Sequence, residues 1–141
     1  MSLKEYADFA NENRNCYLAT VEGDRPRVRC LGMWFADETG FYFQTQSVKA
    51  MCKQLEKNPS VEVYFNSKDF SKIMRVSGRV RFIGDRDLRA KCIKDRPFVK
   101  TFGITEPENP LLAIFQIHTG EAYFWTMADS MKEDKIPRVK F

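Results

Sequence analysis

A series of short strand-like segments, separated by turn residues, is the feature that most constrains how this chain folds. Two turn sequences, Glu22-Gly23-Asp24 and Asp37-Glu38-Thr39-Gly40, follow one another closely, which predicts an antiparallel meander at the start of the chain. Apolar or alternating segments predict strands over residues 16–21, 26–35, 41–45, 61–65, 73–83, 111–117 and 122–127, and a last edge strand over 136–141. Closing a sheet of such strands into a barrel removes its exposed edges.

Helical spacing is confined to a few short segments. Residues 3–13 show it first, with Ser2 and Glu5 at the spacing of a capping box. A helix over 47–57 places apolar residues at i, i+3, i+4 and i+7, and Asn58-Pro59 ends it. The predicted fold class is therefore mainly β, an antiparallel six-stranded barrel with peripheral helices.

The second half of the chain contains three further predictions. Asp85 is expected to cap a helix that runs through Lys94. Residues 95–110 contain three prolines and are expected to be irregular. His118-Thr119-Gly120 is expected to form the turn between the strands over 111–117 and 122–127.

Composition limits the classes of protein to which the chain can belong. Its 141 residues fit a single domain, residues 1–141, which can form a core without disulfides or metal. Four cysteines without C-x-x-C spacing and one histidine argue against a zinc site and indicate free thiols. The net charge of +4 is weak evidence for nucleic acid. Without an apolar leader or a run of ~20 apolar residues, we expect a cytoplasmic protein that does not enter a membrane.

The segment from Gly40 to Pro59 points to a phosphate-binding site. A short strand ends in the polar residues Gln44 and Thr45, and the chain turns near Ser47 before a helix with Lys49 in its first turn. This arrangement gathers a hydroxyl, free backbone N–H groups and an ammonium at the positive end of a helix dipole. Because that dipole disfavours a cation alone, a bound anion would explain why Lys49 stands there.

A second basic position lies on the strand over 26–35. Alternation places Arg25, Arg27 and Arg29 on one face, and Arg29 lies deepest, next to an apolar run. A buried guanidinium requires an anion, so we favour a ligand role for Arg29 over a structural ion pair. The arginines of the strand over 73–83 are interpreted as a solvated face, and a nucleic-acid-binding barrel is the less favoured alternative.

Conventional catalytic groups are not evident. His118 stands alone at the expected turn, without a nucleophile to activate, and paired carboxylates are not apparent. Trp125 is most simply a core residue, although its ring is also suited to cover a flat ligand. The catalytic residue therefore remains unassigned.

Several motifs taken together resemble the pyridoxamine 5′-phosphate oxidase-like family, whose members form a split β-barrel and usually bind FMN. The resemblance runs from Cys16 to about Trp125. Its motifs are R-x-R-x-L at 27–31, D-E-T-G-F-Y-F-Q-T at 37–45, S-V-K-A at 47–50, N-P-S-V-E-V at 58–63, V-S-G-R-V at 76–80 and Y-F-W at 123–125.

The resemblance implies a role for each site residue. Arg29 and Lys49 match positions that hold the FMN phosphate, with Ser47 helping, and Gln44 and Thr45 match the strand end along the flavin and ribityl chain. Backbone from Cys30 and Leu31 to Trp34 would face the flavin ring. Trp125 matches an aromatic residue at the cofactor, often from the second subunit, because family members are typically homodimers with cofactor sites at the interface.

The chain departs from the family pattern in two places. Val48 stands where a second basic residue often precedes Lys49, and the sequence after Trp125 lacks the arginine-histidine signature of the vitamin oxidases. We therefore expect an FMN-binding oxidoreductase, a flavin reductase or an oxidase-like enzyme, that is not a true pyridoxamine phosphate oxidase. Its substrate is unassigned, and NAD(P)H or a small molecule is the expected electron donor or acceptor. A non-catalytic sensor or carrier that binds flavin, deazaflavin or haem is the alternative.

Overall fold

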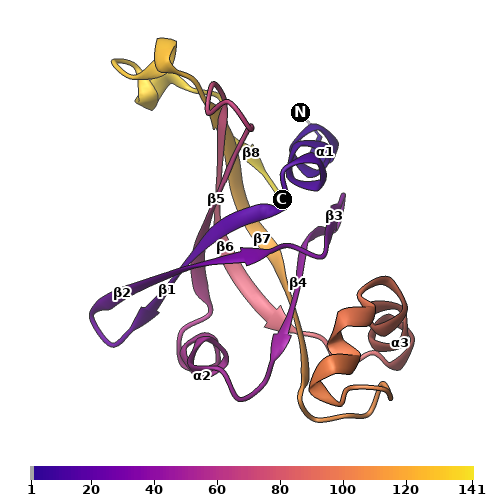
Figure 1. Cartoon of the computed structure of the whole chain (residues 1–141). Helices are drawn as coiled ribbons and strands as arrows, with labels where there is room; N and C mark the ends of the chain where they lie inside the picture. The colour runs from indigo at the N-terminus through magenta and orange to yellow at the C-terminus, as the bar shows by residue number, and fades with distance from the viewer. Residues whose placement is uncertain (1) are drawn as a thin grey trace.

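The structure, a computed structural model that describes residues 2–141, is built on one curled antiparallel sheet of eight strands (Figure 1). The strands lie in the order β2-β1-β5-β6-β7-β4-β3, and β8 pairs with β7. The elements are α1 (Lys4–Glu12), β1 (Asn15–Glu22), β2 (Arg25–Gly32), β3 (Phe35–Asp37), β4 (Gly40–Gln46), α2 (Ala50–Lys57), β5 (Ser60–Asn66), β6 (Ile73–Phe82), α3 (Arg86–Asp95), the 3₁₀ helix η1 (Pro97–Phe102), β7 (Leu112–Trp125), the 3₁₀ turns η2 (Met127–Asp129) and η3 (Glu133–Lys135), and β8 (Val139–Lys140).

The mainly β fold is confirmed, with eight strands where six were expected, and the barrel is split rather than closed. β2 and β3 follow one another in the chain, yet they lie at opposite ends of the strand order. The two predicted turns do join antiparallel strand pairs, β1 with β2 and β3 with β4. The predicted strand over 26–35 is confirmed to Gly32 and wrong beyond it, and the predicted meander is wrong where it would pair the second strand with the third. The chain leaves β2 at Met33, whose N–H donates to Arg14 O at 2.9 Å, and reaches β4 at Trp34, whose N–H donates to Tyr42 O at 3.0 Å. This crossing carries the chain from one edge of the sheet to the other.

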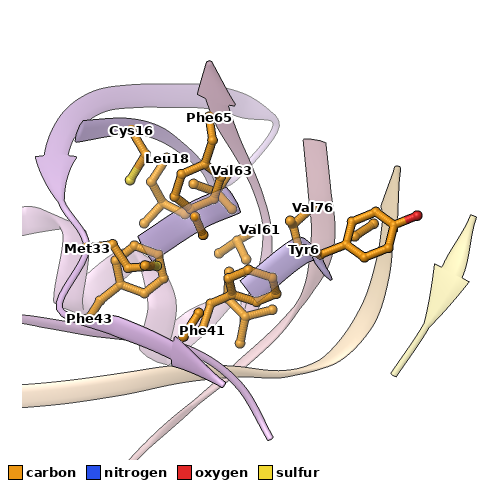
Figure 2. Packing of buried hydrophobic residues seen from close by; sticks show 14 of the residues in the cluster. Tyr6, Cys16, Leu18, Met33, Phe41, Phe43, Val61, Val63, Phe65 and Val76 are labelled. Carbon is orange, nitrogen blue, oxygen red and sulfur yellow. The ribbon is translucent and has the colours of Figure 1, made fainter. Parts of the chain in front are cut away.

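The main core fills the inside of the curled sheet. Leu18, Phe41, Val63 and Phe65 are fully buried there, and Figure 2 shows side chains from β1, β4 and β5 pointing toward one another. The helix α1 contributes Tyr6 to this core (Figure 2), and the Tyr6 ring stacks on that of Phe124 with 4.5 Å between the centroids. Each of these strands thus buries one of its two faces in a shared apolar core, as the alternating pattern predicts.

The strand β7 is continuous over 14 residues, so the turn predicted at His118-Thr119-Gly120 is wrong. The register between β6 and β7 shifts where Arg79 pairs with Thr119 and Val80 pairs with Ile117. His118 is the extra residue of this β-bulge. The long strand β6 pairs with β7 on both sides of the bulge. His118, Thr119 and Gly120 therefore belong to a strand and not to a turn.

One of the two predicted helix N-caps is confirmed, and the other is wrong. Asp85 caps α3 as predicted, because its carboxylate accepts the N–H of Leu88 at 2.9 Å. The predicted capping box of Ser2 and Glu5 is wrong, since Leu3 occupies the N-cap of α1 and no side chain caps that end. Within residues 2–141, none of the helices has the length and apolar character that a bilayer span requires.

Candidate functional site

A cavity of about 410 Å³ lies where β2, β4, the start of α2 and the η1 segment meet. Its walls are formed by Arg29, Cys30, Leu31, Gly32, Gln44, Thr45, Gln46, Lys49, Ala50, Met51, Arg96, Phe98 and Phe102. Six of the eight predicted site residues belong to this wall. Its volume falls within the range of small-molecule sites, about 300–1,000 Å³.

Arg29 lies in β2 and is held by neutral oxygen atoms. Its guanidinium donates to Thr20 Oγ1 at 2.8 Å, to Gln54 Oε1 at 2.7 Å and to Leu18 O at 3.3 Å. Across residues 2–141 it forms no ion pair, and its Nε–H meets no acceptor. Partial burial lowers the pKa of Arg29 from its ordinary value. The charge of Arg29 therefore has no protein counter-charge beside the cavity.

Lys49 occupies the N-cap of α2, one residue before the helix, and not its first turn as predicted. Its backbone is extended, with φ −70° and ψ 146°, and its N–H donates to Gln46 O at 3.1 Å. The helix starts later than residue 47 because this turn takes up the residues that follow β4. The Lys49 side chain is exposed and is in none of the ion pairs formed by the described residues. It thus stands beside the free N–H groups of the helix start.

Ser47 does not line the cavity, although it lies close to Lys49 in the sequence. Its hydroxyl donates to Pro110 O at 2.7 Å, and its N–H donates to Leu111 O at 2.9 Å. These two bonds tie the turn after β4 to the segment that precedes β7. In this structure the hydroxyl of Ser47 therefore has a structural role and does not face the cavity.

Trp125 lies far from the cavity of its own subunit. Leu112, at the start of β7, pairs with Gln46 beside the cavity, whereas Trp125, at the end of the same strand, pairs with Ile73. A strand of this length spans roughly 40 Å. Trp125 and the cavity therefore lie toward opposite ends of the sheet.

Two buried polar atoms in the cavity wall have no hydrogen-bond partner. They are Thr45 Oγ1 and Arg96 Nε, and no other buried side-chain nitrogen or oxygen in the described part of the chain shares this state. Both Gln44 and Thr45 are buried at the end of β4. Leaving a buried polar group unpaired costs about 1–3 kcal/mol. The cavity wall is therefore suited to a ligand that brings polar atoms.

Arg96 is the site residue that sequence reasoning missed. It stands between α3 and η1, donates to Gly32 O at 3.2 Å, and places its guanidinium 5.1 Å from the centroid of the Phe98 ring. Burial lowers its pKa from the ordinary value. The sequence predicts residues 95–110 as irregular, so no periodicity indicates where the Arg96 side chain points. The one local feature that marks this position is that Arg96 directly precedes Pro97.

Of residues 30–34, which were expected to face the flavin ring, only the first three line the cavity. Cys30, Leu31 and Gly32 line it, whereas Met33 and Trp34 turn away and are buried. The indole N–H of Trp34 donates to Asp95 at 3.2 Å, which anchors this crossing under α3. The wall beside β2 thus ends at Gly32.

The electrostatics of the cavity favour an anion. Arg29, Lys49 and Arg96 line it, and no aspartate, glutamate or histidine is among its lining residues. The wall offers hydrogen-bond donors, a free thiol at Cys30 and apolar surface. Such a set of residues binds and orients a polar anionic molecule, and it lacks a general acid–base pair.

Known proteins resemble this chain over most of its length. The family model described as pyridoxamine 5′-phosphate oxidase matches residues 2–126. A NimC/NimA family protein from Clostridium acetobutylicum is 25% identical, with a TM-score of 0.79 over 97% of this chain and 91% of that chain. General Stress Protein 26 from Bacillus anthracis is 21% identical, with a TM-score of 0.76 over 100% of both chains.

A third solved structure shares the fold at lower identity. It is a pyridoxamine 5′-phosphate oxidase-related, FMN binding protein from Nostoc punctiforme, 14% identical, with a TM-score of 0.62 over 91% of this chain and 86% of that chain. At such identities the likeness shows the fold alone, whereas the family model covers most of the chain. This chain belongs to the pyridoxamine 5′-phosphate oxidase family.

Proposed function

We propose that this chain is an FMN-binding oxidoreductase that works as a homodimer with its cofactor sites at the subunit interface. The observation that carries the proposal is the cavity wall, which joins Arg29, Lys49 and the start of α2 without a carboxylate. Membership of the family supports a flavin-binding, oxidoreductase-like protein. The cations and polar groups of the cavity wall support the finer proposal of FMN.

Different residues of the wall would hold different parts of FMN. Arg29 and Lys49 would hold the phosphate together with the free N–H groups of Ala50 and Met51. The unpaired hydroxyl of Thr45, with Gln44 beside it, would hydrogen-bond the ribityl hydroxyls. Cys30 and Leu31 would then lie beside the flavin ring.

The chemistry would come from the cofactor, and the protein would position it. A bound flavin supplies hydride or electron transfer. The side chains of this cavity bind and orient, and none of them is assigned as a catalyst. NAD(P)H or another small molecule would act as electron donor or acceptor. The chain after Trp125 reads T-M-A-D-S-M-K-E-D-K, without an arginine-histidine pair, so we propose a substrate other than pyridoxamine phosphate.

The proposed dimer would complete the site. Val28 and Val48 are both 70% exposed, and they adjoin Arg29 and Lys49 in the sequence. Exposed apolar side chains next to a charged cavity are suited to burial by a second subunit. Because Trp125 lies at the far end of its own sheet, it would reach a cavity only as Trp125 of the partner subunit.

The absorption spectrum of the purified protein tests the cofactor. We expect flavin bands and about one FMN per chain. The variants Arg29→Ala and Lys49→Ala are expected to bind FMN at least about tenfold more weakly, because each loses a charge-assisted contact. Arg25→Ala and Lys53→Ala, which remove cations outside the cavity wall, should retain wild-type flavin content. Unchanged flavin content in both cavity variants would refute the phosphate assignment.

A second candidate function is a sensor or carrier that binds flavin, deazaflavin or haem without turnover. It is favoured by the cavity wall, which offers no acid–base pair. The spectrum separates the three cofactors, and mixing the holoprotein with NADH or NADPH separates the functions. Bleaching of the flavin bands, followed by their return on adding an electron acceptor, would support the oxidoreductase.

A further inference from the structure

The guanidinium of Arg96 lies apart from the cations proposed to hold phosphate. It donates to the carbonyl of Gly32, which is three residues beyond Arg29 along β2. At about 3.3 Å per residue, the two backbone positions are about 10 Å apart. The two guanidinium groups are also held by different partners, Arg29 by Thr20, Gln54 and Leu18, and Arg96 by Gly32.

Arg96 also lacks a counter-charge in the protein. Its neighbour Asp95 is paired with Lys91 at 2.8 Å and accepts the indole N–H of Trp34 at 3.2 Å. The nearby Arg14 adds further positive charge and is itself bonded to backbone oxygen atoms. No ion pair in residues 2–141 includes Arg96, and its Nε is buried without an acceptor. An uncompensated, partly buried guanidinium is costly, so an anion is the missing partner.

Two aromatic rings line the same cavity as this guanidinium. Phe98 and Phe102 line the same cavity and are 47% and 49% exposed, and Phe98 lies under the Arg96 guanidinium. An arginine fork matches the two oxygens of a carboxylate, and exposed phenyl faces pack against a planar apolar group. These two features select one class of molecule, a planar aromatic acid.

We propose that Arg96 binds the carboxylate of a small aromatic acid substrate, whose ring packs against Phe98 and Phe102. The inference rests on the proposed function for the flavin that would lie next to it, and it names the substrate class of that site. The substrate acid and the FMN phosphate would then occupy opposite ends of one cavity, each with its own cation.

Benzoate and its neutral analogue benzamide test the proposal by calorimetric titration of the holoprotein. Wild-type protein is expected to prefer benzoate. Arg96→Gln should weaken benzoate binding at least about tenfold, with benzamide binding and FMN content unchanged, because one charge-assisted pair is lost. Arg96→Lys should retain part of the preference, since it keeps the charge without the fork. Lys100→Gln, which removes an exposed cation of η1 outside the cavity wall, is the matched control and should bind as wild type.

Two results would overturn the proposal. The first is equal binding of benzoate and benzamide by wild-type protein, and the second is an unchanged preference in Arg96→Gln. If that variant also loses FMN, Arg96 is assigned to the cofactor. If the protein purifies without flavin and does not take up FMN, the proposed function fails. The same titration of that flavin-free protein still decides the role of Arg96.

Discussion

Gln54 of α2 and Arg29 of β2 are joined by a hydrogen bond of 2.7 Å, in which the guanidinium donates to the amide oxygen. Thr20 donates to the same oxygen at 2.7 Å, and Gln54 is buried. The amide nitrogen of Gln54 points to Glu22, at 3.4 Å, and that carboxylate is paired with Arg27. A neutral oxygen thus fixes Arg29 in place, while the nearby carboxylate is occupied by another arginine.

Replacing this neutral oxygen with a carboxylate is expected to weaken FMN binding. Gln54→Glu keeps the shape of the side chain, but its charge would pair with Arg29 and compete with the phosphate. We expect a loss of at least about tenfold in FMN affinity. Riboflavin, which lacks the phosphate, should bind Gln54→Glu as it binds wild type, and fluorescence titration measures both ligands.

The control for this variant is Glu56→Gln, which changes one charge elsewhere on α2. It should leave both affinities unchanged. If Gln54→Glu binds FMN as wild type does, Arg29 does not contribute its charge to the phosphate.

Two glycines lie opposite each other in the paired strands β6 and β7, and a methyl group at either one is expected to destabilise the fold. Gly78 pairs with Gly120, and a Cβ on Gly120 would lie 2.1 Å from Ser77 O and 2.7 Å from Gly78 Cα. Because these neighbours are backbone atoms, the strands would have to separate. Gly120→Ala should lower the free energy of unfolding by about 1–3 kcal/mol. Urea denaturation measures it, and Gly84→Ala, whose Cβ meets nothing within 4 Å, should be near neutral.

The edge strand β3 depends on one amide side chain from α1. Asn11 donates to Ala36 O at 2.8 Å and accepts from Ala36 N at 2.9 Å, so it pairs this residue as a neighbouring strand would. Asn11→Ala should cost about 1–3 kcal/mol of unfolding free energy, since the backbone groups of Ala36 lose both partners. Thermal unfolding measures the loss, and Glu12→Ala, an exposed neighbour, is the control. Equal stability of the two variants would show that β3 does not need this bond.

The four free cysteines should differ in reactivity toward a thiol reagent. Cys30 is exposed and lines the cavity, whereas Cys16, Cys52 and Cys92 are buried. Burial raises the pKa of Cys16 to about 12 and that of Cys92 to about 11, so at pH 8 both remain protonated and unreactive. We expect one fast-reacting thiol in the native protein, absent from Cys30→Ser and slowed by added FMN. Two or more fast thiols in native wild type would contradict this arrangement.

Local patterns in the sequence determined much of this protein. The alternation of β1 and β5, the cap at Asp85 and the basic positions Arg29 and Lys49 follow from neighbouring residues, because burial, capping and charge act over a few positions. The tertiary structure alone decided which strands pair. The crossing at Met33 and Trp34 depends on hydrogen bonds to Arg14 and Tyr42, and the unbroken β7 depends on its pairing along the length of β6.

The cavity shows the same division. The sequence alone identifies Arg29 and Lys49 as candidate anion-binding residues. That both line one cavity depends on how β2 and α2 pack. Arg96 lines the same cavity although its segment shows no periodicity in the sequence. Ser47 does not line it, because its hydroxyl donates to the carbonyl of Pro110, 63 positions along the chain. Contacts between residues so far apart in sequence leave no local signal, because they form only when distant segments pack together in the folded protein.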